Sequence, residues 1–251
     1  MTLVSVITVV KDNSSGLMET FVSLNSQSSD DWEMIIIVGK SKDDTLKTAK
    51  NIASKNSRVS VYEQCGNGIY SAMNEGVELS RGKYLWFMNS GDSFADITSI
   101  SVAVKEIESS DISLLIGGYR LKDSEKSFGL KRGSVTTRSF MFSRKGGCHQ
   151  SMLFRASVVR DFSGYNTNYS LASDFDLVLR IIKSNNVLRI PNILSIIEPG
   201  GRADIGIKKV YSRKHQIRNN VSNSIFVSSA SIFWTVAAIA KGEIKGFLRK
   251  K

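Results

Sequence analysis

Lys83-Tyr84-Leu85-Trp86-Phe87-Met88-Asn89-Ser90-Gly91-Asp92-Ser93-Phe94 is the segment from which the architecture of this chain can be worked out. Five consecutive apolar residues, Tyr84 to Met88, predict a short strand buried on both faces, as in a parallel sheet. A polar turn, Asn89 to Asp92, ends the strand. Ligands bind beyond the carboxyl ends of such strands. Asp92 is therefore a candidate ligand of Mg2+ or Mn2+, and through the ion of a diphosphate; alternatively, Asn89 and Asp92 only satisfy backbone groups of a turn.

The residues before this segment alternate between buried strands and amphipathic helices. This alternation predicts an α/β fold with a mostly parallel central sheet and helices on both faces, joined by right-handed crossovers. Neither a dinucleotide-binding glycine motif nor a P-loop motif is present. The expected strands are Leu3–Val10, Trp32–Val38 and Arg58–Glu63, and the expected helices are Leu17–Ser26, Thr45–Lys55 and Ile69–Ser80.

Acidic residues follow three of the four strands predicted in this half, at what becomes one edge of a parallel sheet. They are Asp12, the pair Asp43 and Asp44, and Asp92. Several acids at one rim favour a binding site, although any single one can instead cap a helix, as Asp43 or Asp44 would for Thr45–Lys55.

The second half of the chain is less regular. A helix beginning near Ser173 carries Asp174 and Asp176, which point to different sides of the helix, and we expect Asp176 to cap or pair. Around it the patterns predict helices Ile97–Glu108 and Ala156–Asp161, strands Ile112–Tyr119, Gly146–Arg155 and Asn186–Ile197, and an irregular segment Lys122–Arg144.

The net charge of +11 is concentrated at the end of the chain. From Ile205 to Lys251 there are ten Lys or Arg residues and a single acid, Glu243. Val221–Ala240 carries no charge, which predicts an amphipathic helix in the interface of an anionic membrane or a helix packed on the body. The nearly balanced body argues against nucleic acid as a partner. Two cysteines far apart in the sequence, neither in a C-x-x-C pair, and no secretory signal favour a reducing, cytoplasmic location. The basic tail favours a peripheral place on the inner face of the cell membrane.

Short motifs between Leu3 and Asp204 together resemble family 2 glycosyltransferases of the bacterial kind that act in surface polysaccharide, O-antigen or colanic acid biosynthesis. No single motif is specific, and the resemblance rests on their order and spacing. The motifs are Ser5–Asn13, Ser41–Thr45, Gly68–Gly76, Arg81–Asp92, His149-Gln150, Ser173–Leu177 and Gly200-Gly201.

This resemblance implies a GT-A fold, a nucleotide-sugar donor, Mn2+ or Mg2+ and inversion at the anomeric carbon. A UDP-sugar is the first expectation, with GDP- or dTDP-sugars as alternatives. Asp92 matches the metal-binding acid and Asp174 the general base that deprotonates the acceptor hydroxyl. The remaining candidate donor-site residues are Asp12, Asp43, Tyr70, Asn74, Asn89, Gly91, His149 and Arg202.

Two of these candidates have a competing interpretation, and three other positions depart from the family pattern. His149 is an active-site residue or a satisfied core histidine, and Arg202 is a phosphate contact or a solvated charge. Val38, Gly66 and Ser71 stand where relatives usually carry acids. The donor base is therefore held differently, is not uracil, or is bound weakly, or the chain is a degenerate member.

The sequence thus predicts a glycosyltransferase domain over residues 1–204, with a nucleotide-sugar half (1–95) and an acceptor half (96–204), and a basic helical tail over 205–251. Its expected reaction transfers a sugar to a glycan acceptor that family analogy makes lipid-linked. A nucleotide-binding scaffold of the same fold is one alternative. A sugar nucleotidyltransferase is another, but it needs a glycine-rich phosphate loop that Asp12–Gly16 does not supply.

Overall fold

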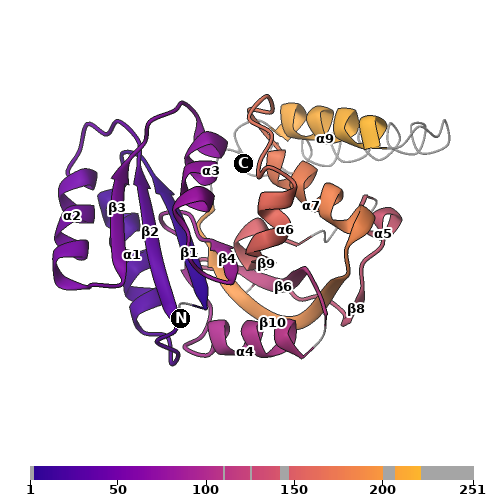
Figure 1. The fold of residues 1–251 in the computed structure, drawn as a ribbon, viewed down its shortest axis with the longest axis horizontal. Helices are drawn as coiled ribbons and strands as arrows, with labels where there is room; N and C mark the ends of the chain where they lie inside the picture. The colour runs from indigo at the N-terminus through magenta and orange to yellow at the C-terminus, as the bar shows by residue number, and fades with distance from the viewer. Residues whose placement is uncertain (1–2, 110, 125, 142–146, 200–206, 222–251) are drawn as a thin grey trace, which may run out of the picture.

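A computed structural model of the chain describes residues 3–109, 111–124, 126–141, 147–199 and 207–221. One sheet runs through both halves of the described chain, in the strand order β3-β2-β1-β4-β9-β6-β10-β5 (Figure 1). The short strands β7 and β8 pair with β6 and β10.

The first half of the chain forms the parallel part of the sheet, as predicted. β1 (Val4–Val10) lies between β2 (Trp32–Val38) and β4 (Tyr84–Phe87), and β3 (Val59–Glu63) pairs with β2; all three pairings are parallel. The crossover helices are α1 (Ser14–Asn25), α2 (Thr45–Lys55) and α3 (Ile69–Leu79). α1 begins three residues before the expected Leu17, because the Asn13 side chain accepts a hydrogen bond from the Gly16 amide and caps the helix.

The second half of the sheet is mixed. β9 (Met152–Arg155) runs antiparallel to β4 and to β6 (Leu114–Leu121), whereas β10 (Val187–Ile197) is parallel to β6. β5 (Ser93–Phe94) pairs with β10 and was not predicted. The segment Lys122–Arg144, expected to be irregular, contains β7 (Ser127–Phe128), β8 (Gly133–Ser134) and α5 (Thr137–Met141). The expected strand Gly146–Arg155 begins only at Met152, after a 3-10 turn, η1 (His149–Ser151).

Helices cover both faces of the sheet. Alternate residues of each strand point to opposite faces, so Ile7 and Val9 of β1 pack with α3, α6 (Ala156–Asp161) and α7 (Ser173–Ser184). Val4 and Val6 pack on the other side with α1, α2 and α4 (Ser99–Glu108). This double cover explains why the strands read as uninterrupted apolar runs in the sequence.

The predicted basic tail begins as a helix, α9 (Ile207–Val221), which packs against α7 (Figure 1). Its Ile217 is fully buried in the core that α7 shares. Among the described residues, no helix has both the length and the apolar character that a membrane span requires. Apart from Val221, the segment expected to lie in a membrane interface falls outside the described residues.

Candidate active site

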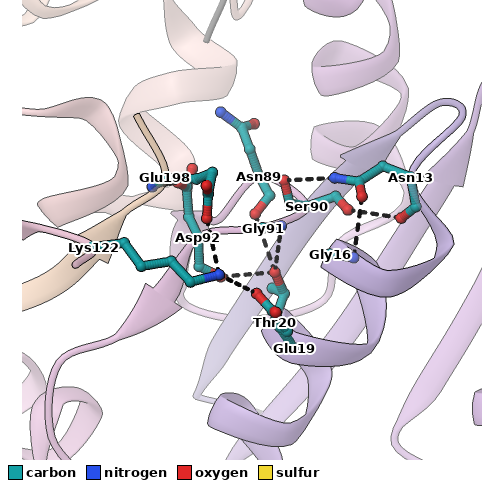
Figure 2. A network of polar contacts seen from close by, with 10 residues as sticks. All are labelled: Asn13, Gly16, Glu19, Thr20, Asn89, Ser90, Gly91, Asp92, Lys122 and Glu198. Carbon is teal, nitrogen blue, oxygen red and sulfur yellow. Dashed lines mark hydrogen bonds and ion pairs between the residues drawn. The ribbon is translucent and has the colours of Figure 1, made fainter. Parts of the chain in front are cut away.

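The loop from Asn89 to Asp92 follows β4 and is fixed onto α1 (Figure 2). The Gly91 amide donates to the Gly16 carbonyl (3.0 Å) and lies 3.1 Å from Thr20 Oγ1. Thr20 Oγ1 in turn donates to the Asp92 carbonyl at 2.7 Å. Gly91 has φ = +97°, a conformation that residues with a Cβ rarely adopt. The polar turn predicted from the sequence is therefore a rigid one that holds Asp92 at the carboxyl end of β4.

Asp92 is a buried carboxylate with a fixed donor on each oxygen. Oδ1 accepts a hydrogen bond from the Glu198 amide (2.8 Å), and Oδ2 accepts one from Gln150 Nε2 (2.7 Å). Burial raises the pKa of Asp92 to about 6, and the nearby Glu198 carboxylate acts in the same direction. The two hydrogen bonds and the Lys122 ammonium act in the opposite direction. The Asp92 carboxylate thus has a fixed orientation in surroundings where burial disfavours its charged form.

An ion-pair network holds Glu198 behind Asp92 (Figure 2). Lys122 Nζ lies 2.7 Å from Glu19 Oε2 and 2.9 Å from Glu198 Oε2, so one ammonium group joins α1 to the end of β10. The carboxylate of Glu198 points to Lys122 while its backbone amide points to Asp92. This network fixes the direction from which the amide donates to Asp92.

The residues at this loop fit a divalent cation. The Oδ1 atom of Asn89 is buried and finds no hydrogen-bond donor among the described residues. Amide and carboxylate oxygens are ligands that Mg2+ and Mn2+ prefer. The described residues contain no cluster of three or more His, Cys, Asp or Glu side chains able to hold a metal. An ion bound by Asn89 and Asp92 would therefore take its other ligands from water and substrate phosphates, as Mg2+ does in nucleotide sites.

Asp174 lies in the first turn of α7. The Tyr70 hydroxyl donates to Asp174 Oδ1 at a long 3.4 Å, and the Tyr70 ring stacks on Tyr165 with centroids 5.5 Å apart. Burial and the Asp174 charge raise the pKa of Tyr70, which keeps this hydroxyl protonated as a donor. Tyr70, expected to shape the nucleotide pocket, thus lies beside the predicted general base.

Asp176 pairs with Arg180 of the same helix, as predicted, with Oδ2 2.8 Å from Nε. The Arg180 guanidinium also donates to the carbonyls of Phe162 (2.6 Å) and Gly164 (2.7 Å). The second acid of this motif therefore ties α7 to the loop before it and leaves Asp174 as the acid beside Tyr70.

The turn η1 connects the two predicted site acids. Gln150 hydrogen-bonds to Asp92, while the preceding residue, His149, interacts with the charge of Asp174. Cys148 interacts with both: burial raises the pKa of its thiol to about 12, and the charges of Asp92 and Asp174 each raise it further. Two carboxylates separated by 82 positions in the chain thus act on the same thiol.

His149 itself is buried among aromatic rings. Its Nε2 hydrogen-bonds to the Tyr165 hydroxyl, and its ring stacks on Phe87 with centroids 4.9 Å apart. Burial lowers its pKa to about 4, so the ring is neutral near pH 7. This environment is that of the satisfied core histidine considered as the alternative, and a direct contact from His149 to the donor stays a prediction.

The other predicted donor-site residues make contacts within the protein. Asp12 accepts a hydrogen bond from the Lys42 amide (2.6 Å) in the loop after β2. Asp43 accepts hydrogen bonds from the amide and hydroxyl of Thr45, the first residue of α2, and these bonds lower its pKa; the N-cap residue of α2 is Asp44. Asn74 holds both the amide (2.8 Å) and the carbonyl (2.9 Å) of Tyr165. Asn89 and Gly91 lie in the Asp92 loop, and Arg202 lies outside the described residues.

Two of the three departures from the family pattern lie around Glu75. This carboxylate accepts hydrogen bonds from the amides of Cys65 (3.0 Å) and Gly66 (2.9 Å) and from the Ser71 hydroxyl (3.4 Å). A Cβ on Gly66 would approach Ser71 Oγ to 2.2 Å, so a side chain at position 66 requires Ser71 to move. Val38, the third departure, is buried at the end of β2. Glu75 therefore supplies an acid to the loop before α3 and the first turn of that helix, where positions 66 and 71 carry none.

Sequence reasoning did not assign roles to Gln150, Glu198, Lys122 or Glu75. Gln150 lies in the His149-Gln150 motif, but its contact with Asp92 joins residues 58 positions apart, so the motif did not reveal it. Glu75 was visible as an acid inside the Gly68–Gly76 motif. Lys122 and Glu198 carry no local pattern that separates them from surface charges.

Comparisons with known proteins agree with this architecture. The family model described as "Glycosyl transferase family 2" matches residues 5–168. The PGL/p-HBAD biosynthesis glycosyltransferase of Mycobacterium bovis is 29% identical over 163 residues, which are 63% of this chain and 61% of that protein. This chain thus spans less than two thirds of that relative's length.

Solved structures show the same fold at low sequence identity. TarS of S. aureus (residues 1–349), in complex with UDP-GlcNAc, has a TM-score of 0.72 at 14% identity, covering 94% of this chain and 71% of that one. The mannosyltransferase PcManGT of Pyrobaculum calidifontis, in complex with GDP-Man and Mn2+, has a TM-score of 0.72 at 13% identity, covering 96% and 75%. The fold is therefore the GT-A fold that the sequence resemblance implied. On the match of its family model, the chain belongs to glycosyl transferase family 2.

Proposed function

We propose that the chain is an inverting glycosyltransferase that moves a sugar from a nucleotide-diphosphate donor to a hydroxyl of a glycan acceptor. The observation that carries the proposal is a chain of contacts between the two acids. Gln150 donates to Asp92, and the next residue back, His149, hydrogen-bonds to Tyr165. Tyr165 stacks on Tyr70, which donates to Asp174. A site with one carboxylate for the departing phosphates and another for the incoming alcohol has the arrangement that in-line displacement needs.

In the proposed reaction, Asp92 and Asn89 would hold a divalent cation, and such an ion would supply positive charge to the departing diphosphate. Asp174 accepts the proton of the acceptor hydroxyl as its oxygen forms a bond to the anomeric carbon. The bond from that carbon to the diphosphate oxygen breaks, and its electron pair leaves with the nucleoside diphosphate. Gln150 and Glu198 keep the Asp92 carboxylate oriented throughout, since each binds one of its oxygens.

A UDP-sugar is the first donor to examine, and GDP- and dTDP-sugars are alternatives. TarS binds UDP-GlcNAc and PcManGT binds GDP-Man with Mn2+, so both bases occur on this fold. Val38 offers no carboxylate to a base, whereas Glu75 is committed to the amides of the loop after β3. We infer that the base is recognised mainly by backbone groups and uncharged side chains at this rim.

The acceptor is proposed to be a lipid-linked glycan at the inner face of the cell membrane. Support for this part comes from the ten basic residues after position 204 and from the relative named for PGL/p-HBAD biosynthesis. A basic segment gains roughly 1 kcal/mol per Lys or Arg near an anionic bilayer.

The proposal is tested with the full chain, Mn2+ and a panel of UDP-, GDP- and dTDP-sugars, with release of the nucleoside diphosphate as the readout. We expect metal-dependent release from at least one donor, and a loss of roughly 100-fold or more in Asp174→Asn, within the range for removal of a general base. Asp161→Asn, an exposed acid at the end of α6, is the matched control. Turnover in Asp174→Asn equal to that of the wild type would reject the proposal.

A second candidate is a nucleotide-binding module without transfer activity. The observation that favours it is the absence of acids at Val38, Gly66 and Ser71. It predicts nucleotide binding that is the same with and without Mn2+, no turnover of any donor, and wild-type function of an Asp92→Ala variant in a complementation assay.

A further inference from the structure

The side chain of Gln150 contacts a second residue besides Asp92. The Cys148 thiol donates a hydrogen bond to Gln150 Oε1 at 2.8 Å. Gln150 Nε2 in turn donates to Asp92 Oδ2 at 2.7 Å. The two contacts use opposite ends of one amide group. The thiol, the amide and the carboxylate therefore form a continuous chain of hydrogen bonds that ends at the proposed metal ligand.

The backbone of the turn η1 is anchored to β4, the strand that leads to Asp92. The Trp86 indole is fully buried in β4, and its Nε1 donates to the Gln150 carbonyl at 2.8 Å. The Ser151 amide donates to the Cys148 carbonyl at 2.9 Å, which closes the 3-10 turn. The Cys148 and Gln150 side chains thus start from a held backbone, and the freedom that remains is in the side chains themselves.

The amide group of Gln150 has two orientations, related by exchange of its oxygen and nitrogen, and only one of them suits Asp92. With Nε2 toward Asp92 the amide donates to the carboxylate, whereas with Oε1 in that place two acceptors would face each other. Cys148 favours the first orientation, because its S–H donates to Oε1 and its sulfur is only a weak acceptor for an N–H group. Burial raises the pKa of this thiol to about 12, so it keeps its proton near pH 7.

We propose that Cys148 is a positioning residue of the active site, whose thiol holds the Gln150 amide in the place and orientation from which Nε2 binds Asp92. This inference rests on the proposed function, because it takes Asp92 as a metal ligand. A partly exposed glutamine side chain otherwise samples several rotamers. A contact at each end of its amide removes this freedom before a ligand binds, which is how supporting residues organise a binding site.

The consequence for the site is measured as Mn2+ affinity, by calorimetry on the full chain with the nucleoside diphosphate of the donor that the wild type turns over fastest. We expect Cys148→Ala to weaken Mn2+ binding by about 5-fold, which is what one hydrogen bond contributes. Cys148→Ser should bind within about twofold of the wild type, because its hydroxyl can donate to Oε1 as the thiol does. Both variants remove the sulfur, so the difference between them reports the hydrogen bond.

A double variant shows whether the thiol acts through Gln150. Gln150→Ala removes the amide, so adding Cys148→Ala to it should weaken Mn2+ binding no further. A general structural role of Cys148 predicts the same loss with and without the Gln150 side chain. The double variant therefore distinguishes positioning of one amide from a loosening of the whole turn.

The hydrogen bond itself is measured in the absence of metal and donor. The chain has two cysteines, Cys65 and Cys148, so Cys65→Ser leaves the Cys148 thiol as the source of the infrared S–H stretching band. A hydrogen bond from the thiol lowers the frequency of this band. We expect the band to move to higher frequency when Gln150→Ala is added, because the acceptor Oε1 is then removed.

Unchanged Mn2+ affinity in Cys148→Ala, beside a loss in Asp92→Asn, would overturn the inference and leave the proposed function intact. Unchanged affinity in Asp92→Asn would overturn the metal-binding role of Asp92 and the inference with it. Should Cys148→Ala fail to fold, the infrared band decides: a band that Gln150→Ala leaves at the same frequency contradicts the inference, and a shift to higher frequency supports it.

Discussion

The loop that carries Asp92 and the helix turn that carries Asp174 hold their carboxylates in opposite ways. Asp92 is buried, and each of its oxygens has a short contact to a donor that is itself fixed, Gln150 or Glu198. Asp174 is only half-buried, and within the described residues its carboxylate has one long contact, to the Tyr70 hydroxyl. A group that binds a cation benefits from a fixed orientation, whereas a base must keep an oxygen available for a proton. The contrast supports the proposal that Asp92 binds a cation and that Asp174 is the base.

Replacement of Asp92 tests whether this carboxylate binds a cation. We expect Asp92→Asn to lower metal-dependent turnover by roughly 100-fold or more, since a bound metal supplies several kcal/mol of charge stabilisation. Asp123→Asn, an exposed acid next to Lys122, is the control and should behave as the wild type. A variant in which Mn2+ stimulates turnover as strongly as in the wild type would show that Asp92 holds no metal.

The pH dependence of stability tests whether Asp92 is as buried as described. Its pKa is raised from 3.8 to about 6, so the folded protein binds this proton more tightly than the unfolded chain does. Its contribution to stability is therefore greatest at low pH and is lost as pH rises from about 4 to about 6. The difference between these two pKa values corresponds to about 3 kcal/mol.

This contribution is isolated by comparing urea unfolding of the wild type and Asp92→Asn without metal. The variant cannot titrate at this position, so its free energy of unfolding should rise relative to the wild type by about 3 kcal/mol from pH 4 to pH 7. A difference that stays constant with pH would mean that Asp92 is ionised as easily as an exposed acid.

Removal of the Gln150 side chain tests the fixed orientation of Asp92. We expect Gln150→Ala to weaken Mn2+ binding, measured by calorimetry in the presence of nucleoside diphosphate, by about 10-fold, as is usual for groups that orient a metal ligand. Gln150→Glu makes the test sharper, because its carboxylate would repel Asp92 and should weaken binding more than alanine does.

Removal of the Tyr70 hydroxyl tests whether Asp174, unlike Asp92, works without a fixed hydrogen-bond donor. Its contact is long, so Tyr70→Phe should lower kcat only about two- to threefold, corresponding to roughly 0.5 kcal/mol at the low end for a hydrogen bond. The ring that stacks on Tyr165 is retained in this variant. A loss of more than about 30-fold would indicate that Asp174 depends on a fixed donor as Asp92 does.

The parallel half of the fold followed from the sequence because its signals are local. β2 and α2 have the predicted bounds, since a local apolar run defines the strand and the acids Asp43 and Asp44 directly precede the helix. The strand β5 has only two residues and shows no periodicity, so its pairing with β10 depends on a contact about 100 positions away. Short antiparallel strands of this kind are set by tertiary packing rather than by pattern.

The acids of the candidate site could be predicted from the sequence, but the residues that contact them could not. Asp92 and Asp174 could be named from motifs, whereas the partners that distinguish them, Gln150, Glu198 and Tyr70, are defined by distance in space. The basic tail was predicted from its charge, and the packing of α9 on α7 was not. A charge run indicates a cationic segment and contains no information about which helix it contacts.

The division of roles between the two carboxylates is tested most directly by calorimetric titration of nucleoside diphosphate, with and without Mn2+, into wild type, Asp92→Asn and Asp174→Asn. We predict that Asp92→Asn loses the Mn2+-dependent part of the affinity, while Asp174→Asn binds as the wild type does yet does not turn over the donor. Equal loss of Mn2+-dependent binding in both variants would contradict this division.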